Sequence, residues 1–229
     1  MKMNLIKIIP LIVILFFAIA RAEDQIPKKN KANYSIENLA RQVVIGTVTK
    51  VQGHPTVLSY KQKEAVRVVA GQPVLSDSSF YCPDNSFISI KLNNKLSYLK
   101  IGQLTSAFLF KDKNTYTVRL HSGFIKTLFK SDDSATQLNI MTNNSLTKIQ
   151  EAKSLFIYNS LFKKTSLVNY KGKVEFSANQ SKNASITLNK LEYSYLDDKM
   201  KTPSEPQLLT PKQLSQFLEA SEIDPEKLD

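Results

Sequence analysis

Residues 86–101 constrain the fold of this chain more than any other stretch. Apolar residues alternate with polar ones at 88–92, and a spacing of two predicts a half-buried strand. Asn93-Asn94 follows and tolerates positive φ at lower cost than most residues, so we expect a two-residue hairpin turn that pairs Leu92 with Lys95. This register puts five apolar side chains on one face: Ile88, Ile90, Leu92, Leu99 and Ile101. An isolated hairpin is marginal in water, so further strands or a helix must cover that face.

The same pattern of short strands continues through residues 42–195. Its apolar segments are separated by turn-forming clusters such as Gly53-His54-Pro55 and Gly71-Gln72-Pro73. We interpret His121-Ser122-Gly123 and Lys171-Gly172 as further turns between separate strands. No helical pattern of useful length fits in this range. Short strands with regular turn signals predict an all-β fold, an antiparallel short-stranded β-sandwich or β-roll, with a short C-terminal helix.

The chain changes character at its C-terminal end. Residues 196–209 are polar and contain prolines, which is typical of a linker. Residues 210–229 are expected to form a short helix followed by an acidic tail, because Thr210 can cap the helix and Gln213 completes a capping box. An apolar stripe predicts that this helix docks either on the β body or on a partner. The acidic tail opposes a basic body, which allows a loose electrostatic contact between them.

The N-terminal segment has the features of a secretory signal peptide. Residues 1–22 combine a basic start, an apolar run and an Ala20-Arg21-Ala22 cleavage pattern. The run is short for a spanning helix, and two alternatives stay open: the segment is cleaved, or it remains as an anchor. Residues 23–41 are interpreted as a polar leader. We therefore expect a periplasmic or extracellular protein that meets a membrane only through the signal segment, if that segment is uncleaved.

The net charge of the chain indicates the kind of partner that it binds, and its cysteine content limits the disulfides that it can form. The formal net charge is +11 and the sequence pI is about 9.5, which favours anionic partners or surfaces. Cys82 is the only cysteine, so no intrachain disulfide can form. It is either a buried small hydrophobe or one half of an intermolecular bridge.

The sequence offers little to support catalysis. His54 and His121 are the two histidines, and both fall in predicted turns without the partners of a Ser-His-acid triad. Their spacing from the cysteine gives no zinc pattern, and no glycine-rich phosphate loop is present. Adjacent carboxylates at Asp132-Asp133 and Asp197-Asp198 are interpreted as turn formers, not as a calcium or glycosidase pair. We expect no enzyme, no cofactor and no metal site.

Lysines interleave with aromatic residues at three places in the chain. Six of them are the candidate binding residues: Lys61, Lys63, Lys111, Lys113, Lys163 and Lys164. Nucleic acid would use such a basic, stackable surface, but export argues against that partner. An anionic envelope polymer or an envelope protein is the partner that we predict.

Four stretches occur in an order that is typical of one known family. They are residues 45–53, 70–90, 118–123 and 170–174. The corresponding patterns of the family are G-x-V-x-x-V-x-G, G-x-x-L followed by S-x-x-x-I, V-x-L-x-x-G and x-G-x-V, and the chain has Val74 at the Leu position of the second. Together they resemble the FecR domain, the periplasmic β-domain of iron-dicitrate sensor proteins, over about residues 43–177. Two common features of the family are absent, a Trp before Gly71 and the R-G-T-x-F hallmark, in whose place residues 146–156 stand.

The resemblance implies an exported β-domain without the iron-sensing role. Such sensors need a cytoplasmic segment that touches a sigma factor, and only residues 1–7 precede the apolar run. Our first hypothesis is an exported, non-enzymatic FecR-like binding or scaffold protein of the bacterial cell envelope. It would contact an anionic glycan or a protein partner. The alternatives are a hydrolase of polysaccharide or cell wall and a structural subunit of an envelope complex.

Overall fold

The computed structural model describes residues 43–60, 62–94, 96–131, 135–179 and 184–220. Contacts divide the chain into two units, Met1–Arg41 and Gln42–Asp229, and every described residue belongs to the second. The predicted signal peptide and leader therefore lie outside the described residues, as do Lys61, Asp132-Asp133 and most of the acidic tail.

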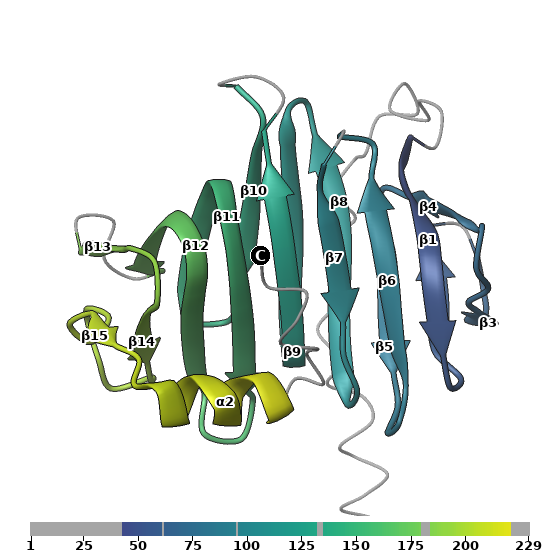
Figure 1. Ribbon diagram of the computed structural model, residues 1–229. Coiled ribbons are helices and arrows are strands. Elements are labelled where there is room, and N and C mark those ends of the chain that lie inside the picture. The colour runs from purple at the N-terminus through teal and green to yellow at the C-terminus, as the bar shows by residue number, and fades with distance from the viewer. Residues whose placement is uncertain (1–42, 61, 95, 132–134, 180–183, 221–229) are drawn as a thin grey trace, which may run out of the picture. The chain divides into compact units, whose positions relative to one another are not determined.

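Fifteen strands in one hydrogen-bonded network and one helix make up the regular structure of the described residues (Figure 1). The strands are β1 (Val44–Gln52), β2 (Thr56–Ser59), β3 (Val66–Arg67), β4 (Pro73–Leu75), β5 (Ser78–Cys82), β6 (Phe87–Leu92), β7 (Tyr98–Ile101), β8 (Thr105–Asp112), β9 (Thr115–Lys130), β10 (Gln137–Met141), β11 (Ser145–Asn159), β12 (Lys164–Ala178), β13 (Ser185–Leu188), β14 (Glu192–Leu196) and β15 (Gln207–Leu208). The helix is α2 (Pro211–Ala220). Neighbouring strands run antiparallel except β9 and β10, which are parallel. The prediction of an all-β fold with a short C-terminal helix is confirmed.

The network folds into two layers because three long strands belong to both. The first half of β9 pairs with β8 and β10, while its second half pairs with β7 and β11. β11 and β12 are divided between the layers in the same way. The first layer has the order β3-β2-β5-β8-β9-β10-β11-β12-β13, and the second has the order β4-β1-β6-β7-β9-β11-β12-β14-β15. Buried apolar side chains from both layers meet in one core between them.

Glycines mark the points where these strands pass from one layer to the other. Gly123 lies inside β9 with a φ of 88°, and Gly172 lies inside β12 with a φ of 80°, values that favour glycine. At Gly172 the backbone of β11 comes so close that a Cβ would lie 3.0 Å from the Cα of Ala152. The prediction of turns at residues 121–123 and 171–172 is therefore wrong. Both clusters bend a continuous strand and do not end it.

The β6–β7 hairpin has a longer turn than the sequence predicted. Ile88 pairs with Ile101 and Ile90 with Leu99, so the predicted register is wrong by two residues. The Leu92 amide donates to the Ser97 carbonyl at 2.9 Å, so the turn closes at Ser97 and not at Lys95. A shift of two residues keeps every side chain on its face. The predicted apolar face is confirmed, since all five of its members are at most 1% exposed.

The outer face of the second layer carries a smaller apolar cluster, which α2 covers. Leu155, Val168, Tyr170 and Leu209 form its buried part, and Leu214 and Phe217 of the helix pack against it. The predicted capping box is present: the Gln213 amide donates to Thr210 Oγ1 at 3.3 Å, and the Thr210 amide donates to Gln213 Oε1 at 3.0 Å. The helix thus docks on its own β body. Within the described residues, no helix combines the length and the apolar character that a membrane crossing requires.

Candidate functional site: a basic face on the second layer

The predicted binding lysines lie on three separate turns. Beyond Lys61 they are distributed as follows: Lys63 between β2 and β3, Lys111 and Lys113 at the β8–β9 turn, and Lys163 and Lys164 at the β11–β12 turn. Lys111 and Lys164 each lie over a neighbouring tyrosine ring, with Nζ 4.6 Å and 4.2 Å from the ring centre. Lys163 Nζ lies 3.6 Å from the carboxylate of Asp198. That these lysines act together as one binding surface stays a prediction.

A denser group of lysines occupies the outer face of the second layer. Lys100 of β7 pairs directly with Lys126 of β9. Lys153 of β11 pairs with Leu128, which places it diagonally opposite Lys126 on the same face. Lys171 of β12 pairs with Lys153 in turn. We call the surface formed by Lys100, Lys126, Lys153 and Lys171 the basic face.

The environment of Lys126 is unfavourable for its positive charge. The pKa of this side chain is lowered from 10.5 to about 8, mainly by partial burial and in addition by the nearby charges of Lys153 and Lys100. Like charges at facing positions of a sheet repel each other, and a protein keeps them only at some cost to stability. An anion bound on this face would relieve that repulsion, so the arrangement is suited to binding a negatively charged partner.

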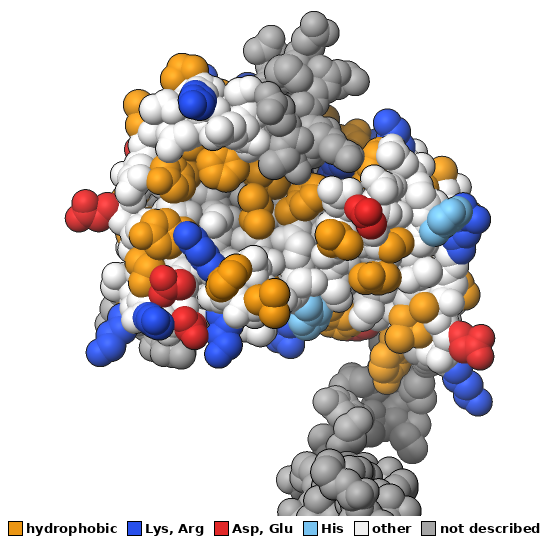
Figure 2. Space-filling view, turned by 90° about the horizontal axis from the view of Figure 1, so that it is seen from below, with side chains coloured by type: hydrophobic (Ala, Val, Ile, Leu, Met, Phe, Trp, Pro, Cys, Tyr) orange, Lys and Arg blue, Asp and Glu red, His pale blue; other side chains and the backbone are white. Residues whose placement is uncertain are grey.

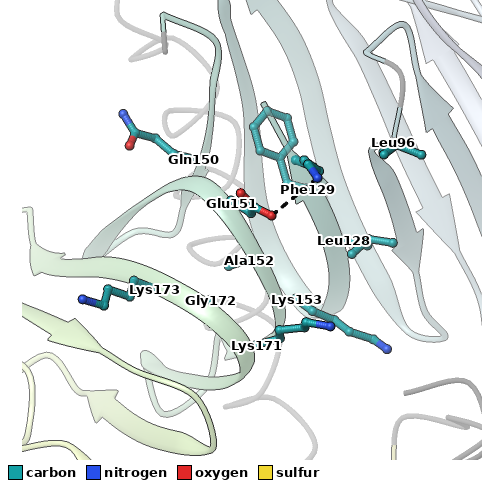
Figure 3. Close-up of a pocket in the computed structure, with 11 residues that line it drawn as sticks. Leu96, Leu128, Phe129, Gln150, Glu151, Ala152, Lys153, Lys171, Gly172 and Lys173 are labelled. Carbon is teal, nitrogen blue, oxygen red and sulfur yellow. Dashed lines mark ion pairs between the residues drawn. The ribbon is translucent and has the colours of Figure 1, made fainter. Parts of the chain in front are cut away.

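A groove of about 680 Å³ opens beside the basic face, at the corner where β11 and β12 pass between the layers (Figure 3). Its apolar lining comes from Leu96, Leu128, Phe129 and Ala152. Its charged lining comes from Lys130, Glu151, Lys153, Lys171 and Lys173. Lys153 and Lys171 extend from adjacent strands toward the same side of the groove (Figure 3). The groove therefore fits a partner with both apolar groups and negative charge.

The spacing of these lysines explains why sequence reasoning missed them. Lys100, Lys126 and Lys153 each stand alone within a strand, as in Ile125-Lys126-Thr127, where the neighbours point into the core, and Lys171 fell in a predicted turn. The alternation does predict that Lys100, Lys126 and Lys153 point outward. Bringing them together requires the strand order β7-β9-β11-β12, and that order depends on pairing between residues distant in the chain.

Among the described residues, the groups considered for catalysis form no cluster. The two histidine side chains lie well apart on the face of the molecule in Figure 2. Asp198 is engaged by Lys163, as described above. Within the described ranges, no group of three or more His, Cys, Asp and Glu residues could hold a metal ion.

Cys82 is buried in the core between the layers. It is 0% exposed, and its thiol donates to the carbonyl of Ile101 at 3.7 Å. Burial raises the pKa of the thiol to about 12, although a backbone hydrogen bond from Ile88 lowers it slightly. This geometry fits the interpretation as a small buried hydrophobe, because the reactive thiolate is both disfavoured and inaccessible.

We expect a thiol reagent to label Cys82 at least about a hundredfold more slowly in the folded protein than in urea, because labelling needs local opening. The measurement is the labelling rate at pH 8 with and without denaturant. Rapid labelling of the folded protein, or a disulfide-linked dimer formed under oxidation without unfolding, would contradict the buried position.

Comparison with known proteins yields a likeness to solved structures. No protein-family model and no curated protein matches the chain. Two crystal structures of a putative anti-sigma factor from Parabacteroides distasonis ATCC 8503, at 2.50 Å and 1.65 Å resolution, match with a TM-score of 0.51 and 10% sequence identity. The likeness is one of fold. The match covers 61% of this chain and 63% and 64% of the two others, less than two thirds of their length.

Proposed function

We propose that this protein is an exported, non-enzymatic FecR-like binding or scaffold protein of the bacterial cell envelope, and that its basic face holds an anionic partner. The signal-like N-terminus supports export, and the order of FecR-like stretches along a β fold supports the family. The fold shared with the structures of a putative anti-sigma factor is consistent with that family, because FecR-like proteins are regulators of the anti-sigma type.

One observation carries the binding part of the proposal. Lys100, Lys126 and Lys153 come from three neighbouring strands and lie on one face, where Lys126 is partly buried near the other two charges and Lys100 Nζ lies 4.2 Å from the centre of the Phe87 ring. A fold selected for stability alone would place an acidic or neutral side chain at one of these positions. The partner that suits this face is an anionic envelope polymer or the acidic surface of an envelope protein.

The apolar stripe of α2 bears on the alternative of a structural subunit. Leu214 and Phe217 pack against the chain's own second layer, so this stripe offers little surface to another protein.

The hydrolase alternative is tested by turnover. Release of product from a purified envelope polysaccharide by the mature protein would overturn the non-enzymatic part of the proposal.

The triple variant K100Q/K126Q/K153Q should bind an anionic polysaccharide at least about tenfold more weakly than the wild type, because each lysine close to a negative surface contributes about 1 kcal/mol. The probe is dextran sulfate, and affinity is measured by titration calorimetry at low and high salt. The matched control is K63Q/K113Q/K163Q, which removes the same charge from the turns first predicted to bind. Equal losses in the two variants would mean that only net charge matters, and the assignment to the basic face would then fail.

A further inference from the structure

The helix α2 leads the chain toward the basic face. It starts beside β15 and crosses β14, β12 and β11 toward β9 (Figure 1). Its side chains Leu214 and Phe217 pack against the apolar cluster on the outer face of the second layer, and Phe124 of β9 packs against the same cluster. Phe124 is two residues from Lys126 along the same strand, and both point outward. The described part of α2 thus ends at Ala220, on the side of the helix that faces β9 and its lysines (Figure 1).

The sequence beyond α2 is complementary to this surface. Residues 221–229 carry four acidic side chains against one lysine, Lys227. Their acidic residues are Glu222, Asp224, Glu226 and Asp229. Ile223 and Leu228 lie between them, and the groove beside the basic face presents apolar side chains of Leu96 and Leu128. The acidic residues of the segment thus have basic counterparts on this surface, and its two apolar residues have apolar counterparts in the groove.

The segment of residues 221–229 is also long enough to reach across the basic face. Nine residues span up to about 30 Å when extended, at about 3.3 Å per residue. Neighbouring strands lie about 4.8 Å apart, so the four strands that carry the basic face span about 15 Å. Among the other segments outside the described residues, 23–41 contains the cluster Lys28-Lys29-Asn30-Lys31 and has the wrong charge for this face, and 132–134 carries only two acidic residues.

We propose that residues 221–229 dock on the basic face of their own chain, with their carboxylates on its lysines and Ile223 and Leu228 toward the groove. The docked segment occupies the surface assigned above to an anionic partner, so it acts as an intramolecular competitor for that partner. The competition rests on the proposed function, whereas the docking does not. The two parts are therefore tested by separate measurements.

The docking is tested on the full mature chain with the variant E222Q/D224N/E226Q. Carboxylates near Lys126 would raise its pKa and lower the fraction of reactive neutral amine. Neutralising them should therefore raise the acylation rate of Lys126 at pH 8 by about twofold, which corresponds to a pKa change of about half a unit for a group whose pKa lies near the pH of the measurement. The rate is measured by mass spectrometry relative to Lys63, which is exposed in the β2–β3 loop.

A charge-matched control separates a local contact from a general electrostatic effect. E64Q/D112N/E205Q removes three exposed carboxylates that take part in no ion pair within the described part of the chain. It should leave the relative rate of Lys126 unchanged. An equal increase in both variants, or none in the tail variant, overturns the docking. A rate ratio that depends on protein concentration overturns the intramolecular contact, because the tail would then bind a second copy.

The competition is tested with dextran sulfate. If the tail variant acylates faster at Lys126 and also binds dextran sulfate several-fold more tightly than the wild type, both parts hold. If acylation changes and neither protein binds dextran sulfate through the basic face, the docking stands and the proposed function fails. If the wild type binds dextran sulfate through the basic face, and the tail variant shows neither faster acylation of Lys126 nor tighter binding, the docking fails and the proposed function stands.

Discussion

Gly172→Ala should lower the free energy of unfolding by about 3 to 5 kcal/mol, a large part of the stability of a typical domain. The residue has a φ of 80°, a conformation that costs an L-residue about 1 to 2 kcal/mol. Its Cβ would also collide with the carbonyl oxygen of Glu151 and lie 3.0 Å from the Cα of Ala152. Both obstacles are backbone atoms of β11, so the close pairing of β11 and β12 at the corner must open.

Gly71→Ala is the matched control for this effect. Gly71 has a φ of 84°, but a Cβ there would meet no heavy atom within 4 Å. Only the conformational cost of about 1 to 2 kcal/mol applies. Urea unfolding of the wild type and the two variants gives both values. Equal destabilisation by the two substitutions would mean that the close approach at Gly172 is not what holds the corner.

The corner at Gly172 also shows why local sequence patterns could not distinguish a turn from a bend within a strand. Gly172 and Gly123 are turn signals by any local criterion, because glycine supplies the positive φ that turns need. The same freedom lets a long strand bend between two layers. Which outcome occurs depends on whether partner strands continue past the glycine, and here β11 pairs with β12 on both sides of Gly172. That information lies in residues distant from the glycine.

The β6–β7 hairpin shows a related limit. Alternation predicted the buried face of residues 86–101 correctly, because every second residue must face the core. Alternation does not change when the register shifts by two, so it cannot fix the length of the turn. That length is set in part by Asn93, whose Nδ2 donates to the carbonyl of Val44 at 2.7 Å. The partner belongs to β1, far away in the sequence.

The candidate site was beyond local reasoning for the same reason. Sequence reasoning chose lysines that are neighbours of aromatic residues along the chain, such as Lys163 and Lys164. The basic face instead joins single lysines of four strands, and only their pairing registers bring them together. Net charge predicted that a basic surface exists, and strand pairing determines where it is densest.

The buried amide of Asn169 is the second position where we expect a large effect. The side chain is 0% exposed, and its Nδ2 donates to the carbonyls of Gly172, Leu188 and Asn189 at 2.9, 3.1 and 3.0 Å. Its Oδ1 accepts from Ser154 Oγ at 3.0 Å. One amide therefore ties the corner of β12 to β11 and to the loop that joins β13 and β14.

Asn169→Asp keeps the shape and removes the donor, so a carboxylate faces three carbonyl oxygens in a buried site. We expect a loss of at least about 4 kcal/mol at pH 7, from unpaired carbonyls and an uncompensated charge. Burial would raise the pKa of this Asp above its unfolded value of about 3.9, so the folded state binds the proton more strongly. The defect should therefore be smallest below that pH and grow as the pH rises.

Asn179→Asp is the control, because Asn179 Nδ2 also donates to two carbonyls, those of Thr142 and Asn143 at 3.0 and 3.2 Å, but the residue is exposed. Water can replace its donor, so we expect a loss below about 1 kcal/mol. Urea unfolding across the acidic range measures both variants. A small, pH-independent loss in Asn169→Asp would mean that the corner tolerates water. In that case the position of Lys171, two residues further along β12, would not depend on a dry corner with all its hydrogen bonds made.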